Sequence, residues 1–293
     1  MKKLLNISDI TQKDFFDIIS YSEELLTKNE NFLINKNIGL IFEKNSTRTR
    51  LSFQVGINQL QGNYIDINLE NLNLNRFETF EDTFEMMGCY LDAIVFRTTD
   101  HMKLELAKKY FKKPIINGLS DISHPCQAVS DIFTLQEHFK RSNNLKIAWL
   151  GDMNNVLFSL AEAVEYLDDV CIDIFTDEKI YLEKKEIFEK FKKISINFEI
   201  NNDLLKNCDC VMTDVFLSMN DNDSDKESLL KRFQVNSEVM SKTKDEAVFM
   251  HCLPAKINFE VSEDVIKGPK SIVVKQAENR LHAQKGILKW LDI

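Results

Sequence analysis

Two arginines stand where a helix is expected to begin. The segment FEKNSTRTRL, residues Phe42–Leu51, follows the apolar run Ile38–Phe42 and leads into a helix-like pattern. The first turn of a helix presents unpaired N–H groups and partial positive charge. Arg48 and Arg50 therefore carry the unfavourable sign there, at a cost of about a few tenths of a kcal/mol. A bound anion removes this conflict.

The hydroxyls around the arginines favour phosphate as that anion. Ser46, Thr47 and Thr49 offer hydroxyls, Arg48 offers a guanidinium fork, and the backbone offers N–H groups. The alternative is that Ser46 or Thr47 simply caps a helix and that the arginines are solvated, but this leaves the arginines unexplained. Because glycines are absent, the segment is neither a Walker loop nor a dinucleotide fingerprint.

His124 and Gln127 form a second candidate group. They are three residues apart, so they share one face if Pro125 opens a helix, a position that suits proline. A lone histidine is commonly a cap or a buried structural group. We favour a functional role because this histidine follows a strand, as the other candidate residues do.

The tetrapeptide His251-Cys252-Leu253-Pro254 follows the apolar run 247–250. Cys252 is either a small buried hydrophobic residue or part of a nucleophilic pair with His251. Neighbouring residues of an extended segment point to opposite faces, so the tetrapeptide alone leaves both interpretations open. Arg97 ends another strand and is a further candidate. The alternative interpretation of Arg97 is a surface residue that pairs with Asp100.

Short apolar runs alternate with longer amphipathic stretches, which predicts an α/β protein with parallel sheets. Ligands of such sheets bind beyond the carboxyl ends of the strands, where the candidate residues stand. Strands are expected at 38–42, 64–68, 93–97, 114–119, 145–150, 170–175, 194–198, 210–214, 247–252 and 271–275. Helices are expected at 12–27 (with Thr11 and Asp14 in capping-box spacing), 49–60, 77–90, 102–111, 156–167, 182–193, 227–233 and 279–291.

The polar stretch 137–144 marks a seam between two domains, each a mainly parallel sheet flanked by helices. The first domain is expected to span residues 1–137, and a last amphipathic helix is expected near the C-terminus. The second is expected at residues 145–275. No repeat of fixed period is present.

Composition limits the function. The formal net charge of -9 argues against nucleic acid and anionic membranes as partners. The six cysteines lack a disulfide-like arrangement, which indicates reduced thiols and a cytoplasmic protein. Cys208 and Cys210 are too close for the usual paired zinc spacing, so neither a metal nor a cofactor is expected. No apolar stretch has the length of a signal peptide or a membrane span.

The motifs together resemble the aspartate/ornithine carbamoyltransferase family, and more specifically its ornithine branch. The resemblance is collinear and covers most of the chain. Its motifs are the segments 42–52 (FEKNSTRTRLS), 116–121 (INGLSD), 124–127 (HPCQ), 214–219 (D-x-x-x-S-M), 251–254 (HCLP) and 277–280 (AENR). Each motif is short, but their shared order is specific. The resemblance also implies that a C-terminal helix at 277–293 returns to the first domain.

The resemblance implies that the anion is carbamoyl phosphate. Its site would comprise Ser46, Thr47, Arg48, Thr49, Arg97, His124, Gln127, Cys252, Leu253 through its carbonyl, and Arg280. Arg97 and His124 would stabilise negative charge that grows on the carbonyl oxygen as an amine attacks the carbon. Phosphate would leave as a dianion matched by Arg48.

For the second substrate, the resemblance implies L-ornithine. Asn155, Asp214, Ser218 and Met219 would hold its α-amino and α-carboxylate ends, and Asp214 and Cys252 would lie near its side-chain amine. That amine must lose a proton before it attacks, and an anionic neighbour raises its pKa. Asp214 is therefore expected to orient the amine, and its role as proton acceptor stays open.

Three segments depart from the family pattern. Asn220 stands where glycine usually follows Ser-Met, and an acidic stretch at 221–225, expected to be a lid, comes next. An arginine often follows the HCLP motif within a few residues, but this chain has Lys256 and no arginine there. The loop 71–78, with Arg76, matches only loosely the family loop that reaches a neighbouring subunit.

The expected activity is carbamoyl transfer from carbamoyl phosphate to ornithine in a homotrimer, giving citrulline and phosphate. The alternatives are a carbamoyltransferase with a different amine acceptor and a regulatory homologue that binds phosphate without turnover. The acidic residues after Met219 disfavour an anionic acceptor such as aspartate. The sequence does not distinguish arginine synthesis from arginine breakdown.

Overall fold

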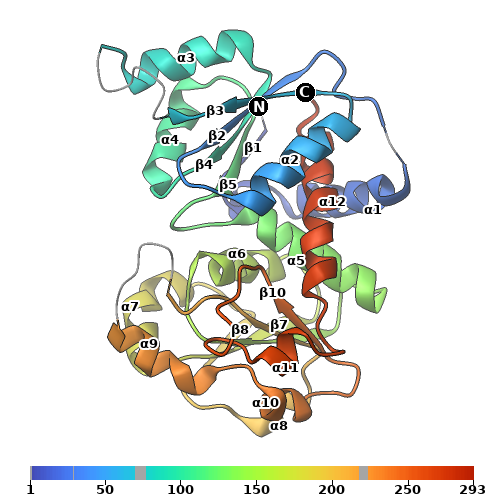
Figure 1. Cartoon of the computed structure of the whole chain (residues 1–293), viewed down its shortest axis with the longest axis vertical. Helices are drawn as coiled ribbons and strands as arrows, with labels where there is room; N and C mark the ends of the chain where they lie inside the picture. The colour runs from blue at the N-terminus through green and yellow to red at the C-terminus, as the bar shows by residue number, and fades with distance from the viewer. Residues whose placement is uncertain (1, 29, 70–76, 218–223) are drawn as a thin grey trace. The chain divides into compact units, whose positions relative to one another are not determined.

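The computed structural model describes residues 2–28, 30–69, 77–217 and 224–293 and divides the chain into two compact units. Unit 1 comprises Met1–Phe133 and Glu278–Ile293, and unit 2 comprises Thr134–Ala277. Each unit contains a five-stranded parallel sheet flanked by helices (Figure 1). The predicted α/β class and the return of the C-terminal helix to the first unit are confirmed.

Unit 1 has the strand order β1-β5-β4-β2-β3. The apolar residues of β4 are buried, as expected for the middle of a parallel sheet. The strands are β1 Lys3–Leu4, β2 Asn37–Phe42, β3 Asn63–Ile67, β4 Ala93–Arg97 and β5 Ile115–Leu119. The helices are η1 Ile7–Asp9, α1 Gln12–Thr27, α2 Thr47–Gln59, α3 Phe80–Tyr90 and α4 His101–Tyr110, with parts of α5 Pro125–Phe139 and α12 Val273–Leu291.

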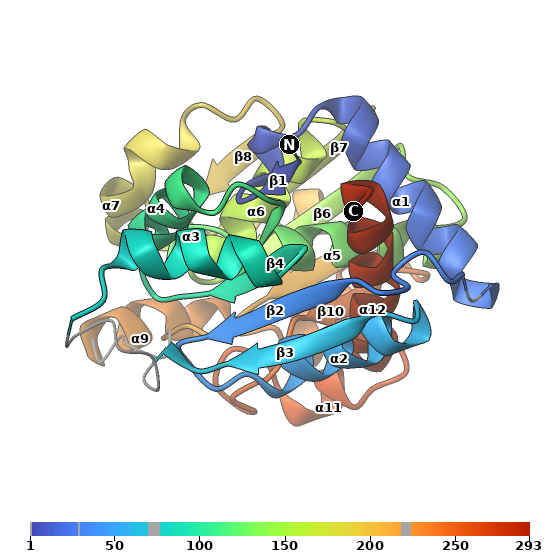
Figure 2. The ribbon, with the colours of Figure 1, turned by 90° about the horizontal axis from the view of Figure 1, so that it is seen from above.

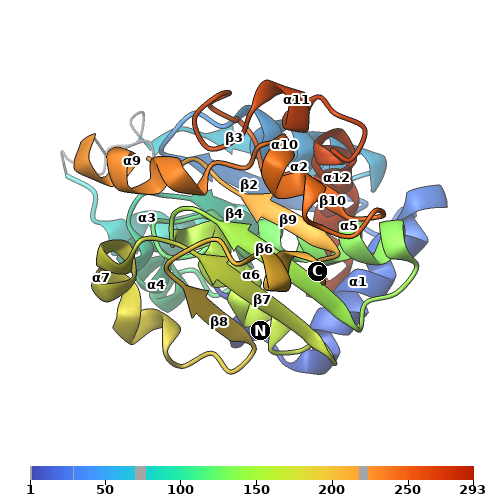
Figure 3. The same ribbon diagram turned by 90° about the horizontal axis from the view of Figure 1, so that it is seen from below.

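Unit 2 has the strand order β10-β9-β6-β7-β8, which Figure 3 shows from below. The strands are β6 Leu145–Leu150, β7 Val170–Phe175, β8 Ile194–Asn197, β9 Cys210–Thr213 and β10 Val248–His251. The helices are α6 Asn155–Val164, α7 Glu178–Phe188, α8 Asn202–Leu205, α9 Ser224–Leu230, η3 Lys231–Phe233, α10 Ser237–Ser241 and α11 Glu263–Ile266.

The C-terminal part of α12 packs along α1 (Figure 2). Trp290 donates a hydrogen bond to Asp14 at 2.8 Å, and Lys289 pairs with Glu24 at 2.9 Å. Lys285 is buried and donates to the carbonyl of Leu25, in the last turn of α1. Cations suit the negative end of a helix.

Several predicted elements match the structure closely. The strands at 93–97, 145–150 and 170–175 and the helix at 12–27 are confirmed at both ends. The capping box is confirmed too: the backbone N–H of Asp14 donates to Thr11 Oγ1 at 3.1 Å, and the Asp14 carboxylate accepts from Thr11. Among the described helices, no segment is both long and apolar enough to cross a membrane.

The predicted strand at 271–275 is wrong. Only Ser271 forms an isolated bridge, to Phe249, and α12 begins at Val273, six residues before the helix start we expected. The apolar run Ile272–Val274 suggested a strand, but the backbone bonds to β10 end at Ile272, and the Gln276 side chain accepts the backbone N–H of His251. Tertiary contacts override strand propensity in this segment.

The predicted helix at 182–193 is displaced. The observed helix α7 begins four residues earlier, because Asp177 caps it by accepting the backbone N–H of Lys179 at 2.9 Å. It ends at Phe188, which packs edge-on against Phe191. The short strand β1 and the short helices α8, α10 and α11 were not expected, since elements of so few residues carry little periodicity.

Candidate functional site

The turn before α2 has a hydroxyl residue at the N-cap position, as the sequence indicated. Ser46 is the N-cap residue with extended backbone (φ -148°), yet its hydroxyl makes no capping hydrogen bond. Within the described parts of the chain, Arg48 also makes no ion pair. Arg50, in contrast, pairs with Asp66 at 3.2 Å and lies 4.8 Å from the Phe42 ring. The two arginines therefore differ: Arg50 serves the fold, and Arg48 remains available to an anion.

Arg280 from α12 joins this turn to α5. Its Nη2 donates to Thr49 Oγ1 at 2.9 Å, and its Nη1 donates to Gln127 Oε1. Gln127 in turn donates to Asp131 at 2.8 Å, and all four side chains are buried. Residues separated by 231 and 153 positions in sequence thus form one polar cluster in unit 1.

Arg97 and His124 lie near this cluster and are both buried. Burial lowers the pKa of His124 well below its usual value, and the charges of Arg280 and Arg97 lower it further. His124 is therefore neutral at physiological pH and can exchange hydrogen bonds without adding a charge. The predicted grouping of Thr49, Gln127 and Arg280 is observed as direct contacts.

Glu43, directly after β2, links the end of β2 to the end of the neighbouring strand β4. Its carboxylate accepts from Thr98 Oγ1 and from Lys103 Nζ, each at 2.6 Å. Its backbone N–H donates to the carbonyl of Arg97 at 3.0 Å. Asp100, which we considered as a partner for Arg97, caps α4 by accepting the N–H of Met102.

The loop before α5 is also held firmly. Asn117 Nδ2 donates to the carbonyl of Leu5 at 2.9 Å and to that of Ser123 at 3.2 Å. Cys126 follows His124 and Pro125 and is fully buried, which raises the pKa of its thiol to about 12. This thiol therefore stays protonated and packs in the core, and it does not act as a nucleophile.

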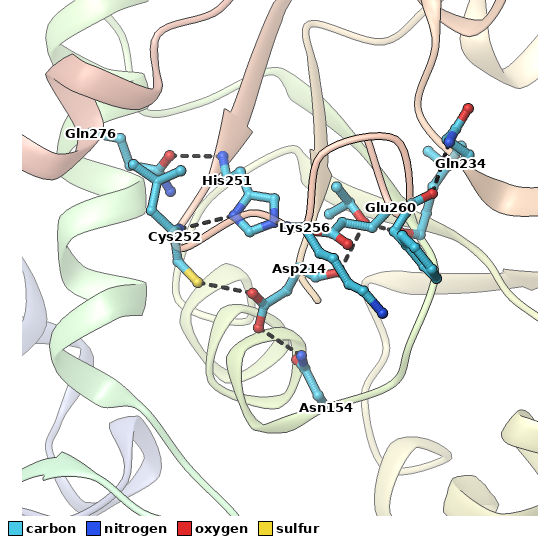
Figure 4. A network of polar contacts seen from close by, with 12 residues as sticks. Asn154, Asp214, Gln234, His251, Cys252, Lys256, Glu260 and Gln276 are labelled. Atoms are coloured by element: carbon cyan, nitrogen blue, oxygen red, sulfur yellow. Dashed lines mark hydrogen bonds and ion pairs between the residues drawn. The ribbon is translucent and has the colours of Figure 1, made fainter. Parts of the chain in front are cut away.

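In unit 2, Asp214 is the centre of a second polar group, drawn in Figure 4. Its Oδ1 accepts from Cys252 Sγ at 3.1 Å, and its Oδ2 accepts from Asn154 Nδ2 at 2.8 Å. Asn154 also caps α6, because its Oδ1 accepts the backbone N–H groups of Val156 and Leu157. The predicted proximity of Asp214 and Cys252 is observed.

Asn155 was predicted to bind ornithine and stays a prediction, whereas Asn154, which contacts Asp214, was not selected from the sequence. Asn155 is the first residue of α6 and is half-buried, whereas its neighbour contacts Asp214. An asparagine just before an apolar helix is the signal that could have identified Asn154. The predicted residues Ser218, Met219 and Asn220, most of the acidic stretch 221–225, and Arg76 lie outside the described residues, as do 71–75.

A buried ion pair stands beside Asn154. Asp152 Oδ2 lies 2.9 Å from Lys226 Nζ of α9, and both side chains are largely buried. Burial raises the pKa of Asp152 to about 6 and outweighs the opposing effect of Lys226. Gly151 precedes it with φ +118°, and a Cβ there would lie 2.5 Å from the Phe216 ring, so only glycine fits.

Donor atoms of Asp214, His251 and Cys252 lie within 4.8 Å of one another, so these three side chains could hold a metal ion. Both ring nitrogens of His251 already make contacts, to the Leu253 N–H and to Glu260. Hydrogen bonding therefore accounts for this grouping. All six cysteines are free thiols.

Comparison with known proteins places both units in one family. A family model described as the carbamoyl-P binding domain of aspartate/ornithine carbamoyltransferase matches residues 2–137. A second model, described as the Asp/Orn binding domain of the same proteins, matches residues 143–291.

Similar relatives and solved structures carry matching names. The ornithine carbamoyltransferases of Methanosphaera stadtmanae and Methanocaldococcus jannaschii are 41% and 38% identical, with 98% of each chain covered. The solved ornithine carbamoyltransferase of Pyrococcus furiosus gives a TM-score of 0.87 at 36% identity, covering 98% of this chain and 96% of that one. The anabolic enzyme of Campylobacter jejuni gives 0.90 at 31% identity, covering 100% and 99%.

Proposed function

We infer the reaction from the premise that the chain belongs to the aspartate/ornithine carbamoyltransferase family, as its motifs predicted. The chain transfers the carbamoyl group of carbamoyl phosphate to the side-chain amine of L-ornithine, giving L-citrulline and phosphate. The amine nitrogen attacks the carbonyl carbon, the carbon–oxygen bond to phosphate breaks, and the amine loses a proton. The buried cluster of Thr49, Gln127 and Arg280 is the observation that carries this conclusion for the first substrate.

For carbamoyl phosphate, we propose that Ser46, Thr47, Arg48 and the N–H groups at the start of α2 bind the phosphate. Arg97, His124 and Thr49 surround the carbonyl oxygen, on which negative charge grows. The neutral state of His124 supports this role, since the ring can donate a hydrogen bond without competing with the arginines for the anion. We assign Gln127, Arg280, Cys252 and the Leu253 carbonyl to the carbamoyl group.

For ornithine, we propose that Asp214 and Cys252 lie beside the reacting amine. The contact of Asp214 Oδ2 with Asn154 supports an orienting role, because Asn154 is itself fixed as the cap of α6. Asn155, Ser218 and Met219 complete the proposed ornithine site. An ammonium bound at Asp214 must pass its proton on before attack, so Asp214 is also the candidate acceptor.

A citrulline assay with alternative acceptors tests the proposal. Purified protein, carbamoyl phosphate and either ornithine, putrescine, aspartate or acetylornithine are expected to give product with ornithine alone at an appreciable rate. Product formed faster with another acceptor would replace ornithine as the assigned substrate. Binding of carbamoyl phosphate with no product from any acceptor would favour the regulatory alternative.

We further propose that the chain works as a cytoplasmic homotrimer. The free thiols favour a reducing compartment. In unit 1 the edge strand β3 exposes Tyr64 and Ile65, and Leu51 and Tyr90 are 56% and 67% exposed. An exposed edge strand with apolar side chains favours contact with another chain. Light scattering should give three times the 34.1 kDa chain mass, and a monomer would reject the assignment.

A further inference from the structure

Glu260 places a fully buried carboxylate against His251. Their atoms Oε1 and Nε2 lie 3.2 Å apart, and the two side chains are 1% and 0% exposed. The same Oε1 accepts the backbone N–H of Lys256 at 2.5 Å. Burying a carboxylate is costly unless it is hydrogen-bonded, and the roles proposed above make no use of this one.

The proton on His251 can be located from its two contacts. The backbone N–H of Leu253 donates to Nδ1 at 2.9 Å, so Nδ1 acts as an acceptor and carries no proton. The proton of the neutral ring is then on Nε2, where it can be donated to Glu260. A doubly protonated ring could not accept from Leu253. The two contacts together select one neutral tautomer.

This ring holds an unfavourable turn of the backbone. Leu253 has φ +58°, a left-handed conformation that suits few residues other than glycine. The ring spans from His251 across Cys252 to the Leu253 N–H, and the His251 backbone N–H is anchored on Gln276 at 2.9 Å. Cys252, between the two, points its thiol at Asp214 (Figure 4).

Glu260 is itself fixed from a third segment. Its backbone carbonyl accepts the N–H of Val235 at 2.9 Å. Gln234 Nε2 donates to the carbonyls of Asn258 and Phe259, each at 2.9 Å, and so ties down the turn that leads to Glu260. The carboxylate is therefore held in place by its own segment and can orient the ring.

We propose that Glu260 is a positioning residue for the carbamoyl transfer. It holds His251 in the Nε2-protonated form and in one orientation, and His251 then holds the Leu253 backbone and the Cys252 thiol. The proposal rests on the proposed function, in which Cys252 and the Leu253 carbonyl contact the reacting groups.

The first test requires no measurement of activity, and a variant serves only to assign the signal. Solid-state ¹⁵N NMR of histidine-labelled protein observes its 5 histidines, and His251 is assigned by its loss in His251→Asn. We expect a neutral Nε2–H ring at pH 7.5. An Nδ1–H ring or an imidazolium at this position overturns the proposal.

The second test separates positioning from folding. Glu260→Ala is expected to lower kcat for citrulline by about 100-fold, as for a misplaced reacting group, and to give His251 a mixture of tautomers. Glu260→Gln keeps an acceptor oxygen at Oε1 and should recover most of kcat. The matched control is Glu263→Ala, an exposed glutamate three residues on, which should leave kcat and KM unchanged.

A double-mutant cycle shows whether Glu260 acts through His251. Asparagine at 251 keeps an oxygen near the Leu253 N–H but is too short to reach Glu260. Glu260→Ala should therefore have little further effect on kcat in the His251→Asn background. Additive losses, or unchanged kcat in folded Glu260→Ala protein, overturn the proposal. If wild-type protein forms no citrulline, the proposed function is rejected instead. The NMR result does not depend on that outcome.

Discussion

At the scale of single residues, neighbouring side chains of the same type have different roles. Arg48 and Arg50 are two residues apart, and their sequence context favoured Arg48 for the anion without indicating a role for Arg50. The structure separates them, since Arg50 is bound by Asp66 and packs on Phe42. Asn154 and Asn155 form a similar pair: the sequence favoured Asn155 for ornithine, and in the structure Asn154 donates a hydrogen bond to Asp214.

Arg48→Ala and Arg50→Ala should therefore have unequal effects. Arg48→Ala removes a charge-assisted, bidentate hydrogen bond to phosphate and is expected to raise KM for carbamoyl phosphate by about 30- to 100-fold. Loss of the half-exposed Arg50–Asp66 pair is expected to change KM less than about threefold. Steady-state citrulline assays at varied carbamoyl phosphate measure both, and equal effects would contradict the assignment of the anion to Arg48.

His124 should make stability depend on pH. Its folded pKa lies well below 6.5, the value expected in the unfolded chain, so below pH 6.5 the unfolded chain binds the extra proton. The free energy of unfolding should then fall with decreasing pH, with a contribution from His124 of about 1.4 kcal/mol per pH unit. Above pH 6.5 this contribution should be flat.

Unfolding measured between pH 5 and 8 for wild type and His124→Gln checks this. The variant should lack the His124 part of the slope. His138→Gln, which removes an exposed histidine of the same helix, is the control and should keep the wild-type slope. If the free energy of unfolding depended on pH in the same way for His124→Gln and wild type, His124 would have the same pKa in the folded and unfolded states.

At the scale of elements, several long periodic segments were predictable, whereas short or context-dependent ones were not, and the 15-residue helix α5 was indicated only by Pro125 at its start. Helix α1 followed from its apolar spacing and capping box, and the central strands followed from their apolar runs. The segment 271–275 has the residues of a strand but enters α12, because its surroundings offer one bridge rather than a partner strand. No local pattern could reveal that Gln276 occupies the edge of β10.

The contact of α12 with α1 depends on Gly286. A Cβ at this position would lie 2.3 Å from Ser22 Oγ and 2.6 Å from the carbonyl of Ile18. Gly286→Ala is therefore expected to lower the free energy of unfolding by about 1–3 kcal/mol, since the α1 backbone must move. Thermal or urea unfolding measures the change.

Gly88 in α3 provides the matched control. A Cβ there meets its nearest atom at 3.8 Å, an ordinary contact with Phe111. Gly88→Ala should raise the free energy of unfolding by up to about 1 kcal/mol through helix propensity. If the two variants shifted stability in the same direction, close approach of α12 to α1 would not explain Gly286.

At the scale of the whole molecule, unit 1 is assembled from two stretches of chain separated by all of unit 2. The α/β alternation predicted two domains, and the family resemblance implied the return of the C-terminal helix. The hydrogen bonds of Arg280 to Thr49 and Gln127 could be proposed only through the family resemblance, because contacts across 231 and 153 residues leave no local trace.

Ligand binding should therefore protect both stretches together. In hydrogen-exchange mass spectrometry, fresh carbamoyl phosphate is expected to slow exchange in peptides covering α2, the end of β4 and residues 278–285. At 100 times Kd the stabilisation would be about 2.7 kcal/mol, enough to slow exchange about 100-fold where exchange needs unfolding of unit 1. Sulfate serves as the control anion, and a response confined to α2 would contradict a shared cluster.

The split of unit 1 has a consequence for biosynthesis. Residues 278–293 leave the ribosome after every residue of unit 2, so a nascent chain can build the sheet of unit 1 long before Arg280 exists to complete its polar cluster. Thr49 and Gln127 lack their hydrogen-bond donor until Arg280 has been synthesised. A chain whose translation stops early would then carry a nearly finished first unit with an incompetent anion site, and such fragments could not sequester substrate from complete molecules.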